Sequence, residues 1–253
     1  MSALRQTMGH SEPDRIEVRG HDLCTELIGK IDFASMLYLE ITGRLPSAGE
    51  ARLVDATLVT LVEHGITPSA LAARLTHLGS PGALQGAVAA GILGAGETFL
   101  GAIEQCAEVL QELRETDDID GYLDGVVGAG GKVPGIGHPF HRPVDPRTPV
   151  LFALAEECLD DTPHIRLLTA LQERAADRFG KDLPVNADGA IAAILSDVGL
   201  SWRVCRGFAV VSRSAGIVGH LHDEASAPIG RAVWDLVEEH VPYERPRGRD
   251  DHR

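Results

Sequence analysis

The stretch SAGEARLVDATLVTLVEHG, residues 47–65, decides the fold class of this chain. Apolar residues recur along it at helical spacing, at Leu53, Ala56, Leu58, Leu61 and Val62. Ser47 precedes this run and Glu50 follows three residues later, which is the pairing of a helix capping box. Gly65 stands where the periodic pattern stops. The stretch therefore predicts an amphipathic helix with a defined start and end.

Segments on both sides repeat this pattern, whereas the alternation typical of strands is confined to residues 15–23. Aromatic residues make up only 4% of the chain, so its core must be built from Ala, Leu, Val and Ile. A core rich in Ala and Leu favours helices over a sandwich or barrel. We therefore predict an all-α fold, with further helices at residues 32–46, 67–79, 98–115, 149–159, 164–179, 186–199 and 202–224.

The formal net charge of −14 argues against nucleic acid or an anionic membrane as the main partner. It also constrains any site for an anionic substrate. Such a site would have to gather arginines locally, because the field of the whole chain repels an anion.

Cysteine usage indicates a reducing compartment. Cys24, Cys106, Cys158 and Cys205 are scattered and include no C-x-x-C pair, so neither zinc spacing nor a disulfide framework is visible. The first residues are charged and lack an apolar run, so we expect no signal peptide. These features predict a cytoplasmic protein without a metal site. The charged tail at 243–253 is expected to be disordered.

Residues 75–96 contain no Asp, Glu, Lys or Arg and could be mistaken for a membrane span. The segment contains Pro81 and six glycines, and its apolar residues are mostly Ala. A lipid-facing helix is normally richer in Leu, Ile and Phe. The composition therefore favours a close-packed interior helix, whose small residues let neighbours approach, and no membrane partner.

The stretch KVPGIGHPFHRPVDPRTP, residues 132–149, is so dense in Gly and Pro that it predicts a loop leading into a helix. It presents four side chains that can carry chemistry, those of His138, His141, Asp145 and Arg147. Glycine lets a backbone approach a ligand closely, and a loop can present an acid/base group such as His138.

Other candidates each have a structural alternative. His64 could be a helix-end histidine favoured by the helix dipole. Asp188, in PVNADG, could simply cap a helix N-terminus. Arg213 lies within the apolar AVVSRSAGIVG, where a buried guanidinium needs an anionic partner that is either distant in sequence or a ligand. The sequence HLHDE at 220–224 lacks the ligand spacing of a helical zinc site, which favours a solvated helix end.

Taken in order, EHGITPS, VPGIGH…DPR, NADG and VVSRSAGIVGH resemble the ordered motifs of the citrate synthase superfamily. The resemblance runs from IEVRGHDL to RAVWDL, which is nearly the whole chain. It implies an all-helical homodimer whose large and small domains close over the substrates. The large domain would comprise residues 1–105 and 205–253, and the small domain residues 106–204, with the active site in the cleft.

The resemblance also implies roles for individual residues. His138 would act on the oxygen at the carbon where the C–C bond forms or breaks, and Asp188 would exchange the proton at the acetyl methyl carbon. His64 would bind the oxaloacetate or citrate moiety, and Arg147 and Arg213 would pair with substrate carboxylates.

Two further elements have implied binding roles. Arg231, in IGRAVWD, resembles an arginine that reaches the partner subunit's site. The adenine pocket for coenzyme A would be lined by Val133, Pro134, Gly135, Ile136 and Gly137. Coenzyme A enters as the thioester substrate, so no tightly bound cofactor is expected.

The chain departs from the citrate synthases proper at residues 94–104. Their motif G-P-L-H-G carries a histidine that bonds the enolate oxygen, whereas this chain has Thr98, Phe99 and Leu100 at that place. The citryl-CoA lyase module of ATP-citrate lyase also lacks this histidine, and the chain resembles that module closely. No Gly-rich phosphate loop follows a strand, so a CoA-ligase step would belong to another protein.

The sequence thus predicts an enzyme that cleaves citryl-CoA, or a related 3-hydroxyacyl-CoA, to acetyl-CoA and oxaloacetate. In that reaction His138 would accept the hydroxyl proton, and Asp188 would deliver a proton to the departing enolate. One alternative is a condensing enzyme that makes citrate or methylcitrate from oxaloacetate and an acyl-CoA. Another is a protein that binds CoA or citrate and has lost the chemistry together with the missing histidine.

Overall fold

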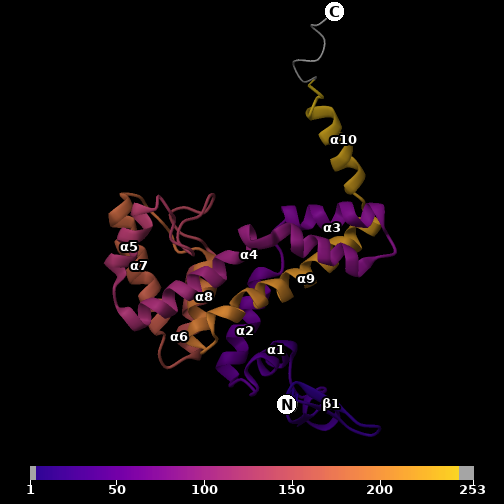
Figure 1. The fold of residues 1–253 in the computed structure, drawn as a ribbon, viewed down its shortest axis with the longest axis horizontal. Helices are drawn as coiled ribbons and strands as arrows, with labels where there is room; N and C mark the ends of the chain where they lie inside the picture. Colours follow the sequence, from indigo (N-terminus) through magenta and orange to yellow (C-terminus); the bar gives the residue numbers. More distant parts are fainter. Residues whose placement is uncertain (1–3, 245–253) are drawn as a thin grey trace, which may run out of the picture. The chain divides into compact units, whose positions relative to one another are not determined.

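The computed structural model describes residues 4–244, so most of the tail expected to be disordered lies outside the described residues. The predicted all-α class is confirmed, since helices make up nearly all the regular structure there (Figure 1). The α-helices are α1 (Phe33–Thr42), α2 (Ala48–Leu61), α3 (Pro68–Gly79), α4 (Leu84–Thr116), α5 (Ile119–Gly128), α6 (Arg147–Cys158), α7 (Pro163–Phe179), α8 (Ala187–Asp197), α9 (Trp202–Ser226) and α10 (Gly230–His240).

A small antiparallel sheet precedes the helices. Its strands are β1 (Gly9–Ser11), β2 (Ile16–Val18) and β3 (His21–Asp22), in the order β1-β2-β3, and a short π-helix η1 (Leu23–Leu27) follows. His10 faces Glu17 in the register of the first pair, and Glu17 faces Asp22 in that of the second. Two of these strands lie in the segment predicted to be extended, and β1 precedes it.

The first helices begin where the sequence predicts. The Ser47 hydroxyl accepts a hydrogen bond from the Glu50 amide at 3.2 Å, and the Glu50 carboxylate accepts one from the Ser47 amide at 2.7 Å. This confirms the capping box of α2. The helix ends at Leu61, earlier than expected, so His64 lies in the loop before α3 and not at a helix terminus.

Two of the α-helices were not predicted. The acidic run TDDIDG at 116–121 has the composition of a turn, but it leads into α5, which Asp118 caps by accepting a hydrogen bond from the Gly121 amide at 2.9 Å. The second is α10, which has a strongly amphipathic sequence but little burial.

The described residues form two compact units. Unit 1 comprises residues up to Glu63 together with Gly96–Ser212, and unit 2 comprises His64–Ala95 together with residues from Arg213 onward. The domain boundaries expected from the sequence differ from these, and that division stays a prediction.

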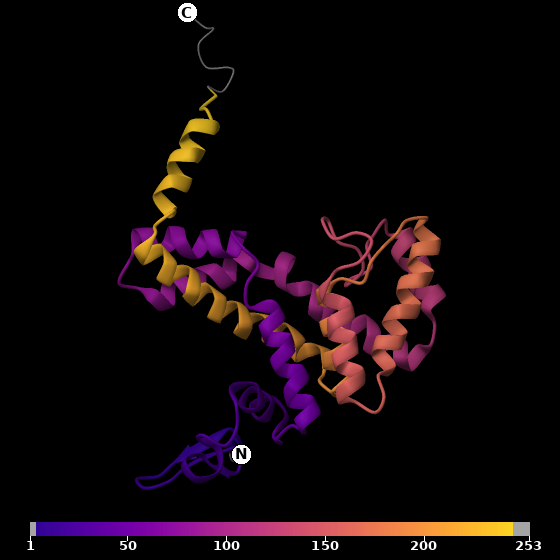
Figure 2. The same ribbon diagram turned by 180° about the vertical axis from the view of Figure 1, so that it is seen from behind.

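Unit 1 is a helical bundle. Helix α8 packs against α6 and α7, while α5 packs against α7 and α2 against α6. In both views α5, α6, α7 and α8 lie side by side (Figures 1 and 2). Nearly every residue of α8 is buried, including Ile191, Ile194 and Leu195. Because α8 is central and its neighbours enclose it, its N-terminus is a fixed point in the unit.

Unit 2 is built on small residues. A Cβ at Gly91 would lie 2.7 Å from Ile217 Cδ1 and 3.0 Å from Ala73 Cβ, and one at Gly94 would lie 2.7 Å from Ala72 Cβ. Glycine at these positions therefore lets α3 and α9 approach the first half of α4, as the composition predicts.

The first half of α4 is buried on one face only, which corrects the expectation of an interior helix. Ala87 is fully buried, whereas Leu84 and Leu93 are 49% and 80% exposed. By length and composition alone α4 could cross a membrane, and 33% of its most apolar window is buried. Gly96 interrupts the helix with φ 53° and ψ −159°, a conformation confined essentially to glycine.

Candidate active site

The loop at 129–146 is tied to the entry of α8. An isolated β-bridge joins Ile136 to Val185. The Gly137 amide donates to the Pro184 carbonyl at 2.7 Å, and the Asn186 amide donates to the Gly135 carbonyl at 3.0 Å. These bonds hold the predicted loop, which has little regular structure of its own, against the buried helix of unit 1.

Glycines make this contact possible. A Cβ at Gly135 would lie 2.6 Å from both Cys106 Sγ and Gly189 Cα, and Gly135 has φ 77°. Only glycine combines that dihedral with so close an approach. The sequence predicted that these glycines let a backbone approach a ligand. In the structure the approach is to α8 and Cys106, and contact with coenzyme A stays a prediction.

Asp188 is not the cap of α8. Asn186 takes that role, since its side-chain oxygen accepts a hydrogen bond from the Gly189 amide at 3.0 Å. Asp188 is instead the second residue of the helix, is half-buried, and raises the pKa of Arg147 through its charge, after the larger contribution of Asp145. The positive end of the helix dipole favours a carboxylate there. Asn186 therefore caps the helix, and the functional role of Asp188 stays a prediction.

Arg147 forms a bidentate ion pair with Asp145. The Asp145 carboxylate accepts hydrogen bonds from Arg147 Nε at 3.0 Å and Nη2 at 2.8 Å, and from the Arg147 amide at 3.1 Å. Its Oδ2 also accepts one from the Ala187 amide at 3.1 Å. These hydrogen bonds let Asp145, which is fully buried, connect the loop, the guanidinium and the start of α8.

The pKa of Asp145 reflects this position. Burial alone would raise it, but the hydrogen bonds and charge of Arg147 outweigh burial and hold the pKa at about 2. Arg147 keeps one nitrogen, Nη1, that makes no hydrogen bond to any residue between 4 and 244, and its side chain is 31% exposed. The guanidinium is therefore fixed in place, with the nitrogen Nη1 left to donate to a ligand.

His138 is held by its own loop. Its Nδ1 accepts hydrogen bonds from the amides of Phe140 at 3.1 Å and His141 at 2.9 Å. An imidazole nitrogen that accepts two hydrogen bonds cannot carry a hydrogen, so the hydrogen of the neutral ring is on Nε2. His138 is half-buried and therefore presents an N–H donor.

The other predicted residues belong to unit 2. His64 is exposed, and Arg213 is half-buried in α9 and not fully buried as expected. Arg231 is exposed, pairs with Asp235 at 2.9 Å, and lies over the Trp234 ring at 4.8 Å. The structure thus places His138, Arg147 and Asp188 in the same unit, with Arg147 and Asp188 near enough for their charges to interact, while the meeting of both sets in one site stays a prediction.

The segment that lacks the synthase histidine lies in α4. Phe99 is 57% exposed, whereas Leu100 is buried. Thr98 is exposed. Within residues 4–244, no group of three or more His, Cys, Asp or Glu side chains could hold a metal ion.

Sequence reasoning missed a basic cavity beside the loop. It has a volume of about 450 Å³ and is lined by Arg142, Pro143, Lys181, Asp182 and Leu183. Two cations on segments far apart in sequence meet there, which no local pattern could reveal. The contact of Asp145 with the Arg147 amide could have been found from the sequence, because an Asp side chain in an Asx turn accepts a hydrogen bond from the amide two residues later.

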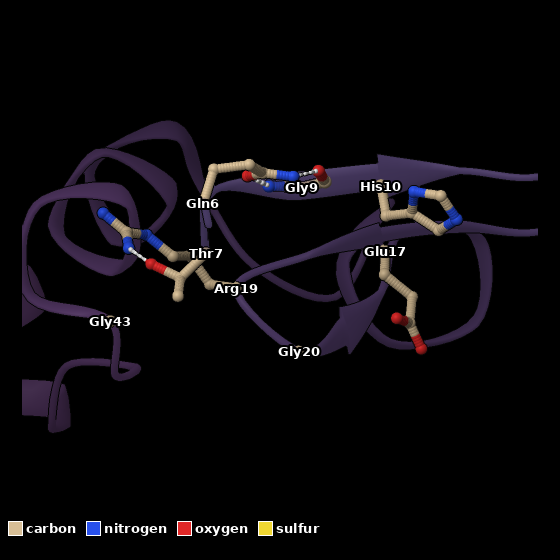
Figure 3. A pocket seen from close by; sticks show the side chains of 8 residues that line it. All are labelled: Gln6, Thr7, Gly9, His10, Glu17, Arg19, Gly20 and Gly43. Atoms are coloured by element: carbon tan, nitrogen blue, oxygen red, sulfur yellow. Dashed lines mark hydrogen bonds between the residues drawn. The ribbon is translucent and has the colours of Figure 1, made fainter. Parts of the chain in front are cut away.

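A second cavity, of about 460 Å³, lies beside the N-terminal sheet and is lined by none of the predicted residues (Figure 3). Arg19, a cation that lines this cavity, already donates hydrogen bonds within the protein. Arg19 Nε donates to the Glu40 carbonyl at 3.0 Å and Nη1 to the Thr7 hydroxyl at 3.1 Å. The cavity therefore offers no cation ready to bind an anionic substrate.

This all-α chain carries an imidazole donor, a carboxylate at a helix start and a fixed guanidinium, which are groups of the kind that enzymes use for acid–base and electrostatic catalysis. The protein-family model for the C-terminal domain of citrate synthase matches residues 12–233. The chain belongs to the citrate synthase family, as its motifs predicted.

Individual relatives divide between two activities. The citryl-CoA lyase of Hydrogenobacter thermophilus has a similar structure, with a TM-score of 0.88 and 30% identity over 98% of this chain and 97% of that one. An ATP citrate lyase mutant of Methanosaeta concilii in complex with (3S)-citryl-CoA shares the fold at a TM-score of 0.80 and 19% identity, over 97% of this chain and 42% of that one. The citrate synthase of Deinococcus radiodurans is 28% identical over 187 residues, which are 72% of this chain and 49% of the relative. The chain thus spans about half the length of the curated relatives it matches.

Proposed function

We propose that this chain is a citryl-CoA lyase, which cleaves citryl-CoA or a related 3-hydroxyacyl-CoA to acetyl-CoA and oxaloacetate. One observation carries the proposal, namely the likeness to the Hydrogenobacter thermophilus lyase over nearly all of both chains. The lack of a histidine at Thr98–Leu100 agrees with it, because the resemblance places the enolate-binding histidine of the synthases there.

The proposed chemistry uses three groups of unit 1, those of Asp188, His138 and Arg147. The hydroxyl oxygen of the substrate loses its proton, the adjacent C–C bond breaks, and a carbonyl forms on the oxaloacetate fragment. The electron pair of that bond passes to the thioester enolate. Asp188, in its protonated form, delivers a proton to the enolate carbon. A half-buried carboxyl group at a fixed helix start suits this transfer.

The geometry of His138 refines its role. The sequence-based hypothesis gave it the hydroxyl proton, which requires a lone pair on Nε2. The two hydrogen bonds that Nδ1 accepts from backbone amides stabilise the other tautomer, in which the hydrogen is on Nε2. We therefore propose that His138 donates a hydrogen bond to the reacting oxygen and stabilises its negative charge, while the hydroxyl proton passes to water.

Binding uses the cationic groups. Arg147, held by Asp145, offers Nη1 to a substrate carboxylate. The loop residues Val133–Gly137 are proposed to bind coenzyme A, and Arg142 and Lys181 in the adjacent basic cavity would meet its phosphates. From the resemblance, His64, Arg213 and Arg231 complete the carboxylate contacts from unit 2.

We also propose that the chain acts as a cytoplasmic homodimer. In α10, Trp234, Leu236 and Val237 are each more than half exposed, as are Val241 and Tyr243 just after it. The helix starts beside α3 and extends away from it in both views (Figures 1 and 2). A row of exposed apolar residues on a helix with so few contacts fits a surface that a second copy covers.

The direct test measures acetyl-CoA release from citryl-CoA by the purified protein. Cleavage is expected, and His138→Ala and Asp188→Asn should each lower kcat at least about 100-fold while leaving the circular dichroism spectrum unchanged. If both variants kept the activity of the unmodified protein, the assigned roles would be wrong.

A second candidate is condensation of an acyl-CoA with oxaloacetate to citrate or methylcitrate. It is favoured by the curated relatives, which are named citrate synthases. Release of free CoA from acetyl-CoA and oxaloacetate, faster than cleavage of citryl-CoA, would support it against the lyase. Binding of both ligands with turnover in neither direction would indicate the non-catalytic alternative.

A further inference from the structure

His141 has no role in the proposed chemistry, yet its ring lies against that of His138. The two ring centroids are 4.3 Å apart and the planes are inclined by 34°. The His141 amide also donates to His138 Nδ1 at 2.9 Å. The ring nitrogens of His141 make no hydrogen bond to any other side chain or backbone group in the part of the chain that the structure describes. The contact between the two imidazoles is therefore the main interaction of this side chain.

The placement of His138 explains why such a contact matters. The residue follows Gly137, which has φ 92°, in a loop that no helix or extended strand holds rigid. Hydrogen bonds at Nδ1 favour this tautomer, but they last only while the ring keeps its orientation. The ring of His141 lies against that of His138 and resists a rotation that would break them. Phe140 cannot serve as well, because its ring centroid is 6.2 Å away and its side chain is 86% exposed.

We propose that His141 is a positioning residue for His138: its ring packs on the His138 imidazole and keeps Nε2–H directed at the reacting oxygen. The inference rests on the proposed function for the identity of that oxygen. It assigns the packing to the flat ring of His141 and gives its nitrogens no part in proton transfer. An aromatic hydrocarbon ring at this position should therefore serve almost as well.

The experiment compares His141→Phe, which keeps a ring, with His141→Ala, which removes it. Citryl-CoA cleavage by the unmodified protein is measured first. We expect kcat to fall about 10-fold or more in His141→Ala with KM changed less than about 3-fold, and to stay within about 3-fold in His141→Phe. Val144→Ala, an exposed change in the same loop, is the control and should leave both constants unchanged.

A second measurement does not depend on turnover. In protein labelled with ¹⁵N-histidine, the signals of His138 are assigned by their loss in His138→Gln. The unmodified protein and His141→Phe should show a hydrogen-free Nδ1, whereas His141→Ala should shift towards the average of the two tautomers.

Three results would overturn the inference. One is a His141→Ala protein with normal kcat and unchanged His138 signals. Another is His141→Phe as impaired as His141→Ala with unchanged His138 signals, since the nitrogen of His141 would then act directly. The third is a normal kcat in His141→Ala despite shifted signals. If the unmodified protein cleaves no citryl-CoA, the proposed function fails, and the histidine signals alone decide whether His141 positions His138.

Discussion

Replacing Asp145 by Asn tests whether this buried carboxylate organises the site. The side chain keeps its shape and loses its charge, so the bidentate contact with Arg147 and the contact with the Ala187 amide are weakened. Depression of the Asp145 pKa from 3.8 to about 2 corresponds to about 2 kcal/mol of stability. Leaving Arg147 without its charged partner adds to this, and breaking a buried pair costs about 3–5 kcal/mol in total. Because Arg147 is partly exposed, we expect a loss of about 2–3 kcal/mol at pH 7.

The stabilisation that Asp145 provides should depend on pH and should decrease as the pH falls. The pKa of Asp145 is lower in the folded protein than in the unfolded chain, so its stabilisation is complete above about pH 4 and is lost as the pH falls through about 2. Asparagine does not titrate. The difference in unfolding free energy between the two proteins should therefore shrink by about 1 kcal/mol between pH 7 and pH 3.

Urea denaturation followed by circular dichroism at both pH values measures this difference. Asp161→Asn is the matched control, because Asp161 pairs with Arg166 at 2.6 Å but both side chains are more than 60% exposed, and it should destabilise the protein much less than Asp145→Asn does. A loss at pH 7 no larger than that of the control, or a loss that does not change with pH, would refute the reasoning.

Three further predictions concern packing, thiols and assembly. Gly189→Ala should destabilise the protein by at least about 2 kcal/mol and lower activity in the same assays, because the added Cβ would overlap the Gly135 carbonyl. Gly125→Ala is the control and should stabilise α5, because the space around it is open; equal effects of the two substitutions would contradict this. Exposed Cys24 should react with a thiol reagent in the folded protein. Burial raises the pKa of Cys205 to about 12 and that of Cys106 further, so both should react only on unfolding; rapid labelling of either would contradict this. Val237→Asp in α10 should give a monomer by sedimentation. Val59→Asp should not, although Val59 on α2 is also more than half exposed; a dimer unchanged by Val237→Asp would exclude α10 from the interface.

The sequence accounts for most helices because their signals are local. The spacing of Leu53 and Leu61 and the Ser47–Glu50 pair lie within one segment, so period and cap could be identified without any tertiary contact. Helix α5 was missed because its cap, Asp118, stands in an acidic run that is equally typical of a turn. The end of α2 before His64 was also missed, since helix ends depend on packing of the last turn.

The candidate site was predicted by the order of its motifs, and its contacts were not. Residue types alone could not separate Asp188 as a cap from Asp188 as a functional group, because both fit a helix start. The contact of Asn186 with the Gly189 amide shows that Asn186 is the cap, and the functional role of Asp188 stays a prediction. Likewise, the sequence could place Asp145 only in a Gly- and Pro-rich loop, whereas its hydrogen bond from the Ala187 amide links two segments more than forty positions apart.

The fold class, the family and the residue types available for chemistry could be predicted without a structure, because periodicity, caps and ordered motifs are properties of the chain. The folded molecule was needed to see which tautomer His138 adopts, which nitrogen of Arg147 stays open and which ring lies on His138. These depend on hydrogen bonds and close contacts that exist only once the loop at 129–146 is folded, with its Gly135 set against the buried start of α8.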